Sequence, residues 1–250
     1  MIGTVGLVLS AHSLNHEIAS LCALATGFYA LALFRRRPRR SLLLFSVALG
    51  IGFLVDGFMP PIILLSTAIL LFILFTQWRR KYFFVYIFLS ALLASPLVLG
   101  WLWLLYHQSP GLPQDWFVHQ HHALSYANHG YFARILVWYA WPALPLALLG
   151  VWKFRTQLFS LVKFQLAFVF LTVTFITLGF AAPDKDIQAL PLLIPLAILG
   201  AGSVEQLKRD FAAALNWFAV MLFSTLGVLV WLGWIAMVTG FPWKLQERMR

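Results

Sequence analysis

The chain has 250 residues, of which 62% are hydrophobic and 10% are charged, and its mean hydropathy is +0.86. Soluble domains carry about 25% charged residues, so this composition excludes an ordinary water-soluble fold. The formal net charge of +10 comes from short basic runs between hydrophobic segments, an arrangement that orients membrane spans and offers no basic face to nucleic acid.

A helix crosses the hydrocarbon layer with about 20 apolar residues, within a range of roughly 17–25. Residues 1–10 are apolar but too short, and they look like the end of a longer helix. The rest of the chain predicts eight crossings, in this order: 18–34, 42–55, 60–76, 82–106, 134–152, 163–181, 188–203 and 212–239. We therefore expect an all-α fold, a polytopic transmembrane helical bundle of about eight spans that forms a single domain over residues 1–250.

Turn residues indicate how some of these helices connect and bend. Segments 42–55 and 60–76 are short and are joined by Asp56 to Pro61, a run with Gly and Pro that predicts a tight helical hairpin. The proline pairs Pro142/Pro145 and Pro191/Pro195 predict kinks in their helices. The only cysteine, Cys22, excludes an intrachain disulfide and a Cys-based zinc site, and we expect it to be buried.

Basic residues give the orientation. Most of the 18 Lys and Arg lie in four clusters at residues 35–40, 79–81, 153–163 and 208–209, and cytoplasmic loops carry such an excess of positive charge. The basic tail, residues 244–250, departs from this rule. All seven histidines fall on the opposite, outer face: His12, His16, His107, His119, His121, His122 and His129. The chemistry is therefore expected on the outer face.

The longest outer loop, residues 107–133, carries the densest set of reactive side chains. His119 and His121 alternate as they would on one face of an extended strand, and Arg134 follows the loop. Imidazoles bind divalent metals when neutral and phosphates when protonated. Three interpretations stay open: a plain interfacial segment, a phosphate or sugar-lipid contact, and a divalent metal. A cofactor other than such a metal is not predicted.

Three further polar groups lie on the outer face. His12 and His16 are spaced i, i+4 on one helix face, which suits either a zinc pair or a polar helix start. Asp56 at the hairpin apex is either a solvated turn residue or a substrate contact. The turn Asp184-Lys185-Asp186 either neutralises itself or presents Lys185 to a phosphate beside the start of the next helix.

Three stretches carry a resemblance to a known family. The first is Ala11–Asn15 with the Ala/Leu-rich span and basic cluster that follow; the second is Ala48–Phe58 with its Pro-Pro; the third is Ala182–Asp186 running into Leu190–Leu199. Together they resemble the membrane glycosyltransferases of the GT-C class, in particular the relatives of protein O-mannosyltransferases and of the lipid A aminoarabinose transferase. The resemblance covers most of the chain in order.

The resemblance implies an inverting glycosyltransferase in a bacterial inner membrane, with its active face periplasmic. Its partners would be a polyprenyl-phosphate sugar donor, a lipid or glycan acceptor, and membrane lipids. His12, Asp56 and the turn Asp184–Asp186 match positions that lie near the donor phosphate in that class, so the resemblance gives them contact roles.

In the same class an Asp in the first outer loop, often beside a Glu or a second Asp, is catalytic. This chain has no such adjacent pair, so the resemblance assigns no catalytic residue and predicts a missing N-terminal catalytic part. Two alternatives remain: an O-antigen-ligase-like transferase that uses the His- and Arg-bearing outer loop, and a non-catalytic membrane subunit that binds lipid phosphates.

Overall fold

The computed structural model describes residues 4, 6–7, 16–79, 82–109, 111–123, 130–153, 161–181, 185–204 and 209–239, except for some side chains near helix ends. Every secondary-structure element in these ranges is helical, which confirms the all-α prediction. The chain divides into two compact units, Met1–Ser203 and Val204–Arg250. The prediction of a single domain over the whole chain stays a prediction.

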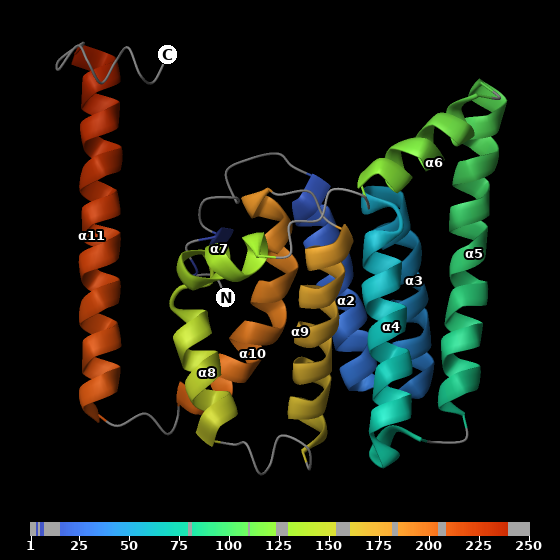
Figure 1. Ribbon diagram of the computed structural model, residues 1–250, viewed down its shortest axis with the longest axis horizontal. Helices are drawn as coiled ribbons and strands as arrows, with labels where there is room; N and C mark the ends of the chain where they lie inside the picture. The colour runs from blue at the N-terminus through green and yellow to red at the C-terminus, as the bar shows by residue number, and fades with distance from the viewer. Residues whose placement is uncertain are drawn as a thin grey trace. The chain divides into compact units, whose positions relative to one another are not determined.

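The helices follow the hydrophobic segments of the sequence closely (Figure 1). In chain order they are α2 (His16–Leu33), α3 (Pro38–Asp56), α4 (Met59–Leu74), η1 (Thr76–Trp78), α5 (Phe83–Gln108), α6 (Leu112–Ala123), α7 (Tyr131–Tyr139), α8 (Ala143–Lys153), α9 (Val162–Ala181), η2 (Asp186–Leu192), α10 (Leu193–Val204) and α11 (Arg209–Thr239). Helices are expected for apolar segments in a membrane, because they satisfy every backbone hydrogen bond internally.

Four described helices are long and apolar enough to cross a membrane: His16–Leu33, Pro38–Asp56, Phe83–Gln108 and Asn216–Val238. The pair α7 and α8 passes the same test together and would add a fifth span. The chain is therefore a helical membrane protein. A count of about eight requires that three shorter apolar helices also cross, namely Met59–Leu74, Phe164–Phe180 and Asp186–Gly202, and that count stays a prediction.

The predicted hairpin is present, because α3 and α4 are separated only by Gly57 and Phe58. Gly57 has a φ of 65°, a conformation that glycine adopts without strain, and its backbone N–H donates to the Phe53 carbonyl at 2.9 Å. Pro60 and Pro61 lie in the first turn of α4, where a missing backbone N–H costs nothing. The chain therefore reverses immediately after Asp56.

Buried polar contacts hold the other end of these helices together. The Ser41 hydroxyl on α3 donates to the Ala30 carbonyl of α2 at 2.7 Å and lies 2.8 Å from the Tyr86 hydroxyl of α5. Farther along the chain, the Trp78 indole N–H on η1 donates to Gln165 Oε1 on α9 at 3.0 Å. These bonds fix where α2, α3, α5 and α9 end relative to one another, and thereby position the polar groups at both ends of the first unit.

Two sequence-based expectations are wrong, and a third is met in an altered form. Residues 112–123 form the helix α6 and not an extended strand, and residues two apart do not share a face of a helix. The premise that grouped His119 with His121 therefore fails. The predicted span 134–152 consists of two helices, α7 and α8, which meet at a bend of 103° beside Pro142, where the sequence predicted a kink. Cys22 is exposed and not buried.

Candidate functional site

The described charges of the first unit separate into two ends. We call one the arginine end: it holds the end of α2, the start of α3 and the segment after η1, with the cations Arg35, Arg36, Arg37, Arg39, Arg40 and Arg79. We call the other the acidic end: it holds the start of α2, the end of α3, α6 and the start of η2, with Glu17, Asp56, Asp115 and Asp186. Figure 1 shows α2 and α3 running between the two ends, with α6 lying across the acidic end.

Asp56 is the centre of the acidic end. The hydroxyl of Ser20 on α2 donates a hydrogen bond of 2.9 Å to Asp56 Oδ2 on α3, across 36 positions of sequence. Ser20 is only 2% exposed, whereas Asp56 is half-buried. The antiparallel packing of α2 on α3 produces this pair, because the first turn of one helix lies beside the last turn of the other. One oxygen of Asp56 is thereby held in place.

Glu17 lies one helical turn before Ser20 and is 9% exposed. Its Oε2 atom is buried and accepts no hydrogen bond from any described residue. The His16 Nδ1 atom lies 3.5 Å away, a separation that gives charge attraction when the imidazole is protonated but is too long for a good hydrogen bond. A buried carboxylate oxygen without a donor is costly, and such groups are found where a protein uses them.

The local sequence explains why an acid is tolerated at this point. Glu17 is in the first turn of α2, where the unpaired backbone N–H groups and the helix dipole favour negative charge. The exposed His16 side chain adds a titratable cation beside it. Glu17 and Asp56 therefore lie at the same end of two packed helices, and Ser20, one turn after Glu17 on α2, bonds Asp56 on α3; we call these three residues the carboxylate cluster.

A second polar contact joins α7 to η2. The Tyr131 hydroxyl donates to Asp186 Oδ1 at 2.5 Å. Arg134 follows Tyr131 by one turn of α7 and Lys185 directly precedes Asp186, and both cations are exposed. The element η2 also packs against α2, so the two polar contacts lie on neighbouring elements. The Tyr131–Asp186 bond thus joins two elements that each carry an exposed cation close in sequence to the bonded residue.

The helix α6 packs over the end of the α3–α4 hairpin. The Trp116 ring lies 5.5 Å from Phe53 of α3, 5.4 Å from Phe58 of the turn and 5.2 Å from Trp101 of α5. Figure 1 shows α6 reaching from the end of α5 to the start of α4. Between α5 and α6 an open apolar groove of about 680 Å³ is lined by Leu99, Gly100, Leu102, Trp103, Tyr106, Pro113 and Phe117.

The predicted site residues have different outcomes. Asp56, Arg134, Lys185 and Asp186 are described, and the structure brings Asp186 into contact with Tyr131 beside Arg134 and Lys185. His12 and Asp184 lie outside the described residues, as do the side chains of His119 and His121, whose backbone belongs to α6. Among the described residues, no group of three or more His, Cys, Asp or Glu side chains is placed to hold a metal ion.

Sequence reasoning missed Glu17, Ser20 and Tyr131. Glu17 was visible as an acid beside His16, but a polar residue at a helix start has an ordinary explanation. Only the pairing of α2 with α3 shows that it is buried next to Asp56. Comparison with known proteins adds no assignment, because no protein-family model, no curated protein and no solved structure matches this chain.

Proposed function

We propose that this membrane protein is a glycosyltransferase that uses a polyprenyl-phosphate-linked sugar donor at its acidic end, on the periplasmic side of a bacterial inner membrane. The observation that carries the proposal is the Glu17–Ser20–Asp56 cluster. It supplies two carboxylates from different helices, one of them with a buried oxygen that accepts no hydrogen bond from the described residues. Sequence reasoning had found no adjacent Asp–Glu or Asp–Asp pair.

The orientation follows from the charges. Cytoplasmic segments of membrane proteins carry an excess of Lys and Arg, so the arginine end is assigned to the cytoplasm and the acidic end to the outside. Polyprenyl-phosphate sugars that serve outer-face chemistry present their sugar on that side. The carboxylate cluster and the sugar of such a donor are therefore assigned to the same side of the membrane.

The chemistry needs a base and a cationic surface. In the proposed inverting transfer, an acceptor hydroxyl oxygen forms a bond to the anomeric carbon while the bond from that carbon to the phosphate oxygen breaks. The hydroxyl proton passes to a carboxylate, for which Glu17 is the first candidate. The departing polyprenyl phosphate keeps the bonding electron pair, and Arg134 and Lys185 stabilise its charge. Asp56, held by Ser20, is then a positioning or acceptor-binding group.

The groove between α5 and α6 suits the isoprenoid part of the donor. It is apolar, open to the side and located at the acidic end, beside aromatic residues such as Trp103 and Phe117. A polyprenyl chain is a branched hydrocarbon, and burial of each CH₂ group of such a chain is favourable by about 0.8 kcal/mol. The groove thus offers the lipid a place near the cationic surface.

A transfer assay tests the proposal. The purified chain in liposomes is incubated with a panel of polyprenyl-phosphate sugars and candidate lipid or glycan acceptors. Transfer by the wild type and a loss of about 10²–10⁴-fold in Glu17→Gln support the proposal, since this is the range that general-base catalysis supplies. Asp115→Asn is the matched control, because Asp115 is an exposed acid at the same end and should leave the rate unchanged.

A second candidate function is non-catalytic binding of a lipid phosphate at the acidic end. The exposed cations Arg134 and Lys185 favour it, because they need no base to hold a phosphate. The same assay separates the two functions. If the protein binds a prenyl phosphate, and loses that binding in Arg134→Gln with Lys185→Gln, but transfers no sugar in any combination, then it is a binding subunit and the transferase proposal is wrong.

A further inference from the structure

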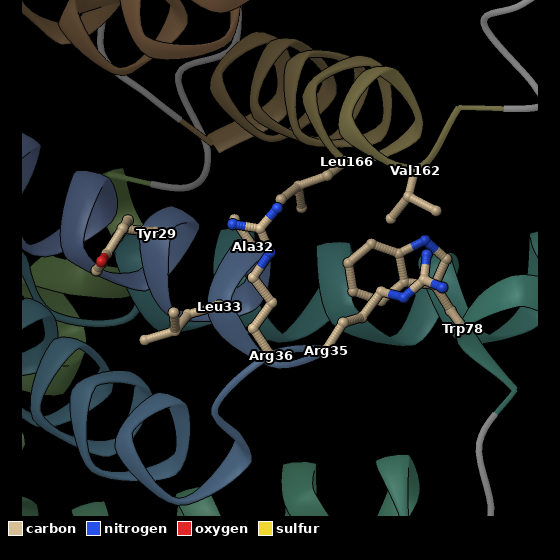
Figure 2. Close-up of a pocket in the computed structure, with 8 residues that line it drawn as sticks. All are labelled: Tyr29, Ala32, Leu33, Arg35, Arg36, Trp78, Val162 and Leu166. Atoms are coloured by element: carbon tan, nitrogen blue, oxygen red, sulfur yellow. The ribbon is translucent and has the colours of Figure 1, made fainter.

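The arginine end contains a pocket that the proposed function does not use. It has a volume of about 650 Å³ and lies between the end of α2, η1 and the start of α9. Figure 2 shows the side chains of Arg35 and Arg36 extending from the end of α2 toward Trp78 and Leu166. The complete lining is Tyr29, Ala32, Leu33, Arg35, Arg36, Trp78, Val162 and Leu166.

The two guanidinium groups of this pocket have no partner among the described residues: neither forms a hydrogen bond or an ion pair. The contrast with Arg79 is informative. Arg79 lies at the same end, but it donates to the carbonyls of Phe72 and Ile73 and thus caps the end of α4. Arg79 therefore has a structural task, and Arg35 and Arg36 have donors available for a ligand.

No described residue of the first unit supplies a counter-charge here. Its four described acids, Glu17, Asp56, Asp115 and Asp186, all belong to the acidic end. The segments 80–81 and 154–160, which connect helices at the arginine end, contain no Asp or Glu in their sequence. Among the described residues of the first unit and in these two segments, Arg35 and Arg36 therefore have no counter-charge, which leaves them available to an external anion.

The rest of the pocket indicates what kind of anion fits. Ala32, Leu33, Val162 and Leu166 make one side apolar, and the buried Trp78 ring forms part of the wall. The indole N–H of Trp78 is already committed to Gln165, so the ring presents no free donor to the pocket. A small soluble anion has no apolar part to bury against this wall. The first acyl carbons of a lipid do, and their burial there is favourable.

We propose that this pocket binds the phosphate headgroup of an anionic membrane phospholipid, with Arg35 and Arg36 on the phosphate and the glycerol and upper acyl carbons against Leu33, Val162 and Leu166. Guanidinium groups suit this role because they donate paired hydrogen bonds to phosphate oxygens. The site is independent of the transfer chemistry at the acidic end, since no residue is shared.

Native mass spectrometry of the full chain measures the binding directly. The protein in detergent is titrated with phosphatidylglycerol and, separately, with phosphatidylcholine. We expect saturable binding of phosphatidylglycerol that is at least about tenfold weaker in Arg35→Gln/Arg36→Gln, because two charge-assisted donors are lost. The matched control is Arg39→Gln/Arg40→Gln, which removes the same charge from exposed residues in the first turn of α3 and should bind like the wild type.

A second variant keeps every charge. Ala32→Trp fills the pocket from its exposed wall, and it should weaken phosphatidylglycerol binding while thermal unfolding stays as in the wild type. Three results would overturn the proposal. One is equal loss in the two double arginine variants, which indicates diffuse charge attraction. Another is wild-type binding in Ala32→Trp. The third is displacement of the lipid by soluble glycerol 3-phosphate at equal concentration, which indicates a water-soluble ligand.

Discussion

The Ser20 hydroxyl donates a hydrogen bond of 2.9 Å to Asp56 Oδ2 and so ties the first turn of α2 to the last turn of α3. Variants at this bond measure its contribution to the free energy of unfolding, separately from catalysis. Ser20→Ala should lower the free energy of unfolding by about 1 kcal/mol, since hydrogen bonds in membrane proteins average roughly 0.6 and reach about 1.7 kcal/mol. Asp56→Asn should cost less, because the amide oxygen still accepts. Thermal or denaturant unfolding in detergent measures both, and equal costs would contradict the bond.

The close approach of α2 and α4 depends on Gly27. A Cβ atom added there would lie 2.5 Å from Leu64 Cδ2, and Leu64 is fully buried. Gly27→Ala should therefore destabilise the protein by about 1–3 kcal/mol, the usual cost of overpacking. Gly100→Ala on α5 is the control, because an added Cβ meets nothing within 4 Å there. Combining Gly27→Ala with Leu64→Val should restore part of the lost stability, because the smaller side chain makes room for the added methyl group. If the control Gly100→Ala is as unstable as Gly27→Ala, this packing is refuted.

The Trp78–Gln165 bond connects η1 to α9 inside the protein. Gln165→Leu leaves the buried indole N–H without this acceptor and should cost about 1–3 kcal/mol. Adding Trp78→Phe removes the donor as well, so the double variant should be more stable than the sum of the two single changes predicts. A double-mutant cycle measured by unfolding gives this coupling. Strict additivity would mean that the bond contributes nothing.

The Tyr131–Asp186 bond should affect donor binding more than the chemical step. It joins α7 to η2, the elements next to the exposed cations Arg134 and Lys185 that are proposed to bind the donor phosphate. In the transfer assay we expect Tyr131→Phe to raise KM for the polyprenyl-phosphate sugar by about 3–10-fold and to change kcat less than twofold. This pattern indicates that substrate binding is weakened and the chemical step is not. Tyr82→Phe, an exposed tyrosine at the arginine end, should change neither. A fall in kcat with unchanged KM would contradict this role.

The fold was largely predictable and the site was only partly so. Each long apolar segment is a helix, and the turn after Asp56 lies where Gly57 and the two prolines indicated it, because hydropathy and turn chemistry are local properties. The break between α7 and α8 was only foreseen as a kink at Pro142. The segment of α6 was misread because alternating histidines fit a strand as well as they fit an amphipathic helix over so few residues.

The site depends on contacts that no local pattern encodes. Glu17 and Asp56 are far apart in sequence, and only the packing of α2 against α3 brings their helix ends together. The same holds for Tyr131 with Asp186 and for Arg36 with Leu166. Except for Glu17, sequence reasoning found the charged residues of the site and the end on which they lie. It could not find their neutral partners, Ser20, Tyr131 and Trp78, because buried serines and aromatic residues are common in any membrane helix.

Cysteine labelling tests the orientation on which the proposed function depends. In a Cys22→Ser background, Asp115→Cys places a thiol on exposed α6 and Arg39→Cys places one at the exposed start of α3. A membrane-impermeant maleimide added to spheroplasts should label the thiol at position 115, and should reach position 39 only after permeabilisation. Labelling of position 39 from outside, with position 115 protected, would place the carboxylate cluster in the cytoplasm and contradict periplasmic sugar transfer.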